Sequence, residues 1–150
     1  VVKAARQLAE EGIATEVFSV TSWSELARDG QACEAMMLAE GDPPLPFVTQ
    51  QLGRSSAPIV AATDYVRAVP ESIRAFLPPG RSFLTLGTDG FGRSDTRAAL
   101  RELFGVDAAS VVRAARRLLA KQGTSSASKA PKKPSLPLTA MAGAGSARSA

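Results

Sequence analysis

The chain has 150 residues, 45% of them hydrophobic and 21% charged, which fits one soluble globular domain and is too short for a two-domain enzyme. Histidine is absent, which excludes Ser-His-Asp and Cys-His catalysis and histidine-ligated zinc. Residues 1–122 carry 14 basic and 14 acidic side chains, so the net charge of +4 lies entirely in residues 123–150 and does not indicate a nucleic-acid surface on the domain.

The first segment has the apolar spacing of an amphipathic helix. Val1, Ala5 and Leu8 fall on one face, and Gly12 is typical of the residue that ends a helix. No capping residue precedes the helix, so we interpret residue 1 as a cut inside a longer polypeptide.

Three runs rich in β-branched and aromatic residues predict strands at residues 14–20, 58–62 and 82–86. Helical segments separate these runs, and strands joined by helical crossovers cannot form hairpins. We therefore expect an α/β fold in three layers, with a mostly parallel sheet covered on both faces.

Several further segments have the pattern of helices or loops. Leu100, Leu103 and Phe104 share one helical face, as do Val112, Ala115 and Leu119, and we expect both faces to pack in the core. Asp107 is the expected N-cap of the last helix and Gly123 its expected stop. The predicted segments are a helical turn at 24–29, a proline-rich loop at 42–46, and helices at 47–52, 65–76, 94–104 and 107–122.

Residues 123–150 have no hydrophobic period and no aromatic residue, and we expect them to be a disordered tail outside the domain of residues 1–122. Such a tail is a flexible linker, a weak electrostatic tether or a segment without a role. The single cysteine, Cys33, is expected to be a small buried apolar residue. The cysteine content and the absence of about 20 consecutive apolar residues indicate a cytoplasmic location and no membrane partner.

Short polar side chains follow each predicted strand. The three steps are Thr21-Ser22-Trp23, Thr63-Asp64-Tyr65 and Thr88-Asp89-Gly90. In a parallel sheet these ends meet at one edge, where ligands and partner domains bind. Helix capping is the simpler interpretation, and we favour it for Thr21 and Asp64.

The loop after the third strand holds three glycines within six residues and leads into a helix. Its Gly-x-x-Gly-x-Gly spacing matches neither the dinucleotide fingerprint nor the P-loop, so an anion site is a weak hypothesis. Its charges alternate in sign, which favours local ion pairs or contacts with another domain. The candidate interface residues are Thr88, Asp89, Gly90, Phe91, Gly92, Arg93, Ser94, Asp95 and Arg97.

Three segments make the chain recognisable: EVFSVTSWSELARDG at residues 16–30, PIVAATDYVRAVPESIRAFLP at 58–78 and TDGFGRSDTRAALRELFGVD at 88–107. In this order and spacing, residues 1–122 resemble the C-terminal domain of the homodimeric pyruvate dehydrogenase component, within the transketolase-like superfamily. The wider superfamily differs at residues 19–22 and 91–95. The family's first strand, expected just before Val1, is missing here, and residues 123–150 lie outside the pattern.

The resemblance implies a fragment of an enzyme that decarboxylates pyruvate on thiamine diphosphate and reductively acetylates a lipoyl group. In that family, upstream domains hold the cofactor and its magnesium ion across the dimer interface, and the catalytic histidines also lie upstream. The implied partners are a second subunit and the dihydrolipoyl acetyltransferase core. The domain itself is then expected to bind no cofactor or metal, to hold no catalytic residue, and to support dimer and interdomain assembly.

Two other classes of function remain open at this point. A separate anion- or nucleotide-binding module would use the strand-end Thr and Asp residues and the glycine loop. A nucleic-acid-binding protein would rely on the basic residues 123–150, but the neutral domain and the lack of interleaved aromatic and basic residues do not support it.

Overall fold

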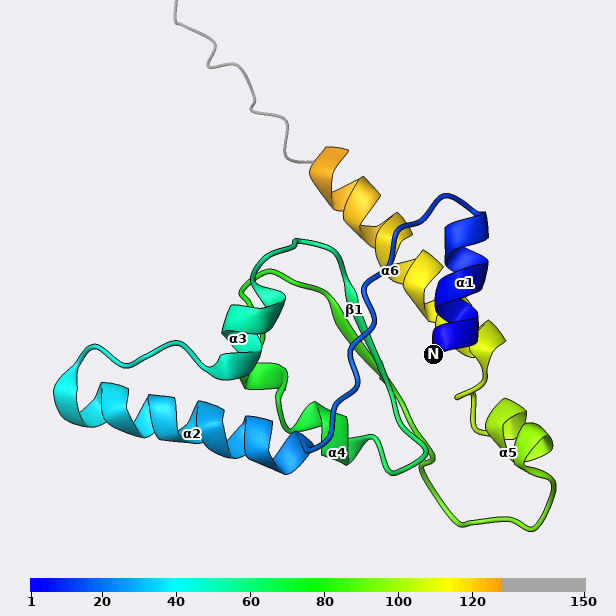
Figure 1. Cartoon of the computed structure of the whole chain (residues 1–150), viewed down its shortest axis with the longest axis horizontal. Helices are drawn as coiled ribbons and strands as arrows, with labels where there is room; N and C mark the ends of the chain where they lie inside the picture. The colour runs from blue at the N-terminus through cyan, green and yellow to red at the C-terminus, as the bar shows by residue number, and fades with distance from the viewer. Residues whose placement is uncertain (128–150) are drawn as a thin grey trace, which may run out of the picture.

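The computed structural model describes residues 1–127, which form a two-stranded sheet between two layers of helices (Figure 1). This arrangement confirms the predicted three-layer α/β fold. In chain order the elements are α1 (Val2–Glu10), α2 (Trp23–Glu40), α3 (Phe47–Leu52), β1 (Ile59–Ala62), α4 (Ala68–Glu71), a short 3-10 helix (Arg74–Phe76), β2 (Phe83–Leu86), α5 (Arg97–Leu103) and α6 (Ala108–Ala127).

The two strands are parallel, with Ile59 opposite Phe83 and Ala62 opposite Leu86. They confirm the strands predicted at 58–62 and 82–86, and α3 confirms the helix predicted at 47–52. The chain between β1 and β2 passes through α4 and the 3-10 helix, which is the helical crossover that parallel neighbours require.

Each face of the sheet packs against its own cluster of apolar side chains. On one face, Val60, Ala62 and Leu86 contact a buried cluster supplied by α1 and α6. On the other face, Phe83 contacts a cluster supplied mainly by α2, α3 and the segment around the 3-10 helix. The first cluster contains Ala4, Leu8, Val111 and Val112, and the second Ala27, Val48, Ile73 and Phe76.

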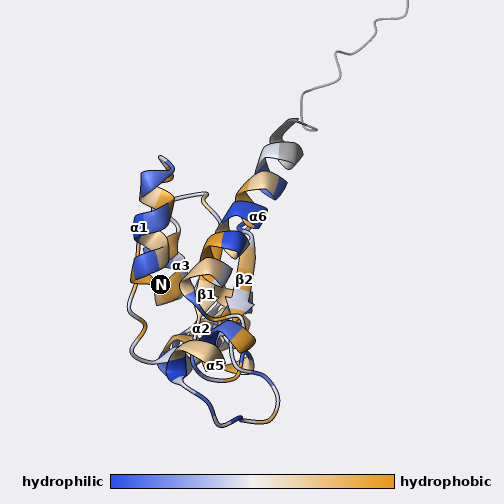
Figure 2. Ribbon diagram, turned by 90° about the vertical axis from the view of Figure 1, so that its right-hand side faces the viewer, coloured by the Kyte–Doolittle hydropathy of each residue, from blue (hydrophilic) through white to orange (hydrophobic). Residues whose placement is uncertain are grey.

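The end of α1 has the hydrogen bonds of a Schellman motif. Gly12 has a φ of +77° and donates its N–H to the Ala9 carbonyl over 3.0 Å, while Ile13 donates to the Leu8 carbonyl over 2.9 Å. Ile13 also packs against the cluster that contains Leu8. The prediction that Gly12 ends this helix is confirmed, and the turn sets α1 against α6 (Figure 2).

Residues 14–20 depart from the prediction of a strand. The structure assigns them no strand, and none of their backbone groups is hydrogen-bonded to another of residues 1–127. Val17 and Phe18 are 45% and 47% exposed. A β-branched run becomes a strand only where a neighbouring strand accepts its backbone hydrogen bonds, and the described chain offers no such neighbour.

Two helical segments also differ from the prediction. α2 has 18 residues, whereas only a turn at 24–29 was expected. The C-terminal half of α2 is largely exposed and has no apolar period that would predict a helix, and Leu38 there is 85% exposed. The helix predicted at 65–76 is broken into α4 and the 3-10 helix. Pro70, the third residue of α4, has no N–H to donate to the Val66 carbonyl, so no regular helix runs from residue 65 into α4.

In α5 and α6, one predicted cap is confirmed and two other predictions are wrong. Asp107 accepts the Ser110 N–H over 3.0 Å, as expected for the N-cap of α6. Leu103 is 58% exposed, so its predicted place in the core is wrong, because α5 lies at the margin and buries no residue. Gly123 does not stop α6, because one glycine costs a helix only about 1 kcal/mol.

Cys33 is 7% exposed, which confirms a buried cysteine. Residues 123–127 belong to α6, and the remainder of the predicted tail, residues 128–150, lies outside the described residues. Among residues 1–127, no helix is both long enough and apolar enough to cross a membrane.

Candidate functional site

The carboxyl ends of β1 and β2 lie together at one edge of the sheet, as the sequence predicted. The parallel register places the residues after Ala62 beside those after Leu86. Thr88 joins the two ends twice, because its N–H donates to the Tyr65 carbonyl and its hydroxyl to the Asp64 carbonyl, each over 2.9 Å. We refer to residues 63–67 and 87–97 as the strand-end edge.

Two ion pairs hold the strand-end edge. Asp89 accepts the backbone N–H of Arg67 over 3.0 Å with one oxygen and the Arg67 guanidinium over 2.5 Å with the other. Asp64 accepts a hydrogen bond of 2.7 Å from Arg101 of α5. These hydrogen bonds lower the pKa of both aspartates. Both carboxylates are therefore ionised and paired with arginine. This arrangement connects the loops to each other and to α5, and it does not favour proton transfer.

The capping roles favoured for Thr21 and Asp64 are wrong. The N-cap of α2 is Ser22, whose hydroxyl accepts the Glu25 N–H over 3.2 Å. Asp64 caps no helix, because α4 begins only at Ala68 and the Asp64 carboxylate is held by Arg101 instead.

The glycine loop, residues 87–97, begins with a close backbone contact at Gly87 and ends at the capped start of α5. A Cβ on Gly87 would lie 2.7 Å from the Tyr65 carbonyl oxygen, so a larger residue does not fit there. At the other end, Asp95 accepts the Thr96 N–H over 2.6 Å, and Thr96 accepts the Ala99 N–H over 3.3 Å to begin α5. Both ends of the loop are thus fixed by local contacts.

The middle of the glycine loop projects into solvent. Phe91 is 96% exposed, and within residues 1–127 neither Arg93 nor Arg97 forms an ion pair. Of the four charged residues singled out in this loop, only Asp89 forms an ion pair within residues 1–127. Asp95 instead accepts a hydrogen bond from the Thr96 N–H. The loop therefore presents an aromatic ring and two arginines outward.

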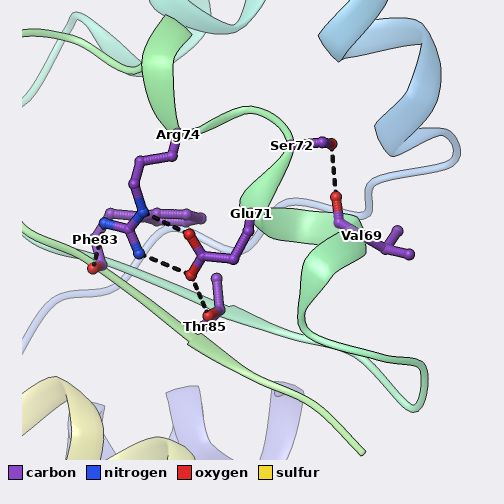
Figure 3. A network of polar contacts seen from close by, with 6 residues as sticks. All are labelled: Val69, Glu71, Ser72, Arg74, Phe83 and Thr85. Atoms are coloured by element: carbon purple, nitrogen blue, oxygen red, sulfur yellow. Dashed lines mark hydrogen bonds and ion pairs between the residues drawn. The ribbon is translucent and has the colours of Figure 1, made fainter. Parts of the chain in front are cut away.

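A polar network that sequence analysis missed attaches α4 to β2 (Figure 3). Arg74 donates two hydrogen bonds to Glu71, of 2.5 and 2.7 Å, and Thr85 donates a third of 2.5 Å. The Arg74 guanidinium also lies 4.8 Å from the centre of the Phe83 ring. The i, i+3 spacing of Glu71 and Arg74 could have predicted their ion pair. No local pattern could have predicted the hydrogen bond from Thr85, which lies 14 residues from Glu71.

These bonds, led by those from Arg74, lower the pKa of Glu71 from its ordinary 4.5 to about 2. A lowered carboxylate pKa stabilises the fold above pH 4.5, and this contribution is lost as the pH falls from 4.5 towards 2. Because the Glu71 side chain is 34% exposed and partly screened by water, we expect a loss of about 1 kcal/mol.

The prediction is checked by urea unfolding of the wild type and of Glu71→Gln between pH 5 and pH 2. Glu71→Gln should remove this part of the acid slope, and Thr85→Val, which deletes one of the three hydrogen bonds, should reduce it in part. An unchanged slope in Glu71→Gln would show that the network does not couple to folding.

A bound metal ion needs several ligand side chains close together. Magnesium ions prefer carboxylate and other oxygen ligands. No group of three histidine, cysteine, aspartate or glutamate side chains lies close enough among residues 1–127 to hold a metal ion. These residues therefore offer no cluster of carboxylates for a metal ion.

The domain belongs to the α/β class, with a parallel sheet between two layers of helices. Residues 1–107 match the family described as the transketolase-like C-terminal domain. The chain belongs to this family. It is 49% identical over 124 residues to the pyruvate dehydrogenase E1 component of Mycobacterium tuberculosis and 47% identical over 124 residues to that of Escherichia coli K12.

Each match covers 81% of this chain but only 13% and 14% of the respective relative. The pyruvate dehydrogenase E1 component of Mycolicibacterium smegmatis is 48% identical over 118 residues, which are 77% of this chain and 12% of that protein. The chain thus spans about one eighth of the length of these relatives. The resemblance inferred from the sequence is confirmed.

Proposed function

We propose that this chain is the C-terminal domain of a longer pyruvate dehydrogenase E1 component. The observation that carries the proposal is 47–49% identity over about four fifths of the chain to proteins of that name. The parent enzyme decarboxylates pyruvate with thiamine diphosphate and magnesium and reductively acetylates a lipoyl group. Both the diphosphate and the metal are bound by domains outside this chain.

Within the parent enzyme, this domain supports assembly and performs no chemistry. The absence of histidine and the pairing of Asp64 and Asp89 with arginine support this role, because both carboxylates are ionised and have no proton to donate as a general acid. The parent is a cytoplasmic homodimer that docks on the dihydrolipoyl acetyltransferase core, with no nucleic-acid or membrane partner.

The glycine loop is the part of the domain that meets a neighbouring domain or subunit. Its ends are fixed by Gly87 and Thr96, while Phe91 is almost fully exposed at its middle. A large exposed ring beside arginines is a common composition at protein interfaces. The interface role extends over the residues that the sequence singled out: Thr88, Asp89, Gly90, Phe91, Gly92, Arg93, Ser94, Asp95 and Arg97.

The test uses the full-length parent protein, with dimerisation and single-turnover decarboxylation of pyruvate measured separately. Phe91→Ala and Arg93→Ala should raise the dimer dissociation constant or weaken cofactor retention, while saturated dimers keep their turnover rate. Arg117→Ala, on the exposed side of α6, is the control. A fall of a hundredfold in single-turnover rate, about 2.7 kcal/mol of transition-state stabilisation, would place the loop in the chemistry and overturn the assembly role. No pyruvate decarboxylation in the wild-type parent would overturn the function itself.

A further inference from the structure

The end of α2 projects from the domain. Residues 34–39 are exposed at every position, and in Figure 1 they lie at the left of the view, beyond the other elements. Five of them in succession, residues 35–39, read Ala-Met-Met-Leu-Ala and are apolar. Because successive residues point in different directions around a helix, apolar side chains surround this segment, which is the pattern of a helix that is buried on all sides. We refer to residues 34–47, which include the loop that returns to α3, as the α2 arm.

Contacts within the domain hold the α2 arm in its exposed position. Gly41 ends α2 with a φ of +86° and donates its N–H to the Met37 carbonyl over 3.2 Å. At the other end of the return loop, Phe47 donates its N–H to the Asp29 carboxylate over 2.6 Å. Three prolines between these two contacts restrict the backbone further: Pro43, Pro44 and Pro46. A partner that covers the arm therefore orders little that is not already ordered, which lowers the entropic cost of binding.

The α2 arm is acidic as well as apolar. Residues 29–53 contain four acidic side chains and no basic one. Glu34 and Asp42 are exposed, and neither forms an ion pair within residues 1–127. The large apolar side chains of the arm are between 49% and 85% exposed: Met36, Met37, Leu38, Leu45 and Phe47. The complementary surface is apolar and positively charged.

The strand-end edge has these complementary properties. Tyr65 and Phe91 are 68% and 96% exposed there, and Arg93 and Arg97 form no ion pair within the described chain. In Figure 1 the glycine loop lies at the lower right, at the opposite end of the domain from the α2 arm. The arm and the edge of one copy therefore do not meet each other. A second copy, turned end to end, brings the arm of each copy to the edge of the other, and two-fold symmetry forms this contact twice.

We propose that the α2 arm of one copy binds the strand-end edge of a second copy in a two-fold dimer of the longer polypeptide. In this contact Glu34 and Asp42 face Arg93 and Arg97, and the apolar side chains of the arm cover Phe91. Pairing of two arms would place acidic side chains together, so charge disfavours that alternative. The inference rests on the interface role proposed for the glycine loop, and it names the surface that this loop meets.

The test is the composition of dimers of the full-length parent protein when two differently tagged variants are expressed together. Glu34→Arg with Asp42→Arg reverses the charge of the arm, and Arg93→Glu with Arg97→Glu reverses that of the edge. A dimer of either variant alone has two like-charged contacts, whereas a mixed dimer has two contacts between opposite charges. In native mass spectrometry, the ratio of mixed to pure dimers should exceed that of random pairing at least about tenfold.

The control pairs the arm-reversed subunit with Arg6→Glu plus Arg117→Glu, which makes the same change of net charge at exposed positions of α1 and α6. Each mixed dimer then has one favourable and one unfavourable contact, the average of the two pure dimers, so pairing should be close to random. Random pairing of the arm-reversed and edge-reversed subunits would overturn the proposal. So would an equal excess of mixed dimers in the control, or a wild-type parent that is monomeric. Dimer composition is measured without pyruvate, so a failure of the proposed reaction is distinguished from a failure of this contact.

Discussion

Replacing Gly30 by alanine is expected to destabilise the domain by about 1–3 kcal/mol, although alanine is the better helix former. Gly30 lies within α2, and a Cβ there would be 2.3 Å from Cγ of the Phe76 ring. Phe76 is 8% exposed and packs in the cluster that joins α2 to the sheet, so the ring has little room to move. Overpacking therefore outweighs the gain in helix propensity.

The matched control is Gly123→Ala in α6, where the added Cβ would meet no side chain of residues 1–127 beyond its two chain neighbours within 4 Å. That substitution should stabilise the domain by up to about 1 kcal/mol. Both free energies of unfolding are measured by urea titration. A double variant, Gly30→Ala with Phe76→Leu, should lose less than the sum of the two single losses, because the smaller side chain makes room for the added Cβ. Shifts of the same sign at the two glycines would contradict the close contact at Phe76.

Replacing Arg81 by methionine is expected to lower the free energy of unfolding by about 2 kcal/mol. The guanidinium donates to the Ala57 carbonyl over 2.6 Å and also to the Leu52 carbonyl, so it ties the end of α3 to the chain entering β1. Burial lowers the pKa of Arg81, and the neighbouring Glu16 acts in the opposite direction. Methionine keeps the apolar stem but leaves both carbonyls without this donor.

Arg28→Met is the control for the same change of side chain at an exposed site. Arg28 pairs with Glu25 on the surface of α2, where the two side chains are 70% and 62% exposed. Exposed pairs of this kind contribute less than about 1 kcal/mol, so the variant should unfold close to the wild type. Equal losses in the two variants, measured in urea at one pH, would show that the Arg81 contacts add nothing beyond the charge.

Sequence patterns predicted helix ends and strands correctly where neighbouring residues determine the structure. Gly12 and Asp107 act at the helix ends where their residue types are favoured, and the strands at 58–62 and 82–86 were visible as β-branched and aromatic runs. The strand predicted at 14–20 failed because a strand needs a partner, which a single segment does not reveal.

Long-range contacts account for what the sequence did not reveal. The full length of α2 was hidden because half of it is exposed and carries no apolar period. At the strand-end edge, the proximity of Asp64 and Asp89 followed from the parallel sheet. Their arginine partners did not, because Arg101 lies 37 residues from Asp64 and Arg67 lies 22 residues from Asp89.

The pairing of α1 with α6 has a consequence for synthesis on the ribosome. α1 and α6 are joined by the cluster around Leu8 and Val112 and by an ion pair between Arg116 of α6 and Glu11, the residue that follows α1, 105 residues away. At a translation rate of about 5–20 residues per second, roughly 5 to 20 seconds separate the emergence of the two helices. The apolar face of α1 is without its α6 partner throughout that interval, so the nascent chain is most open to aggregation and to chaperone binding before α6 emerges.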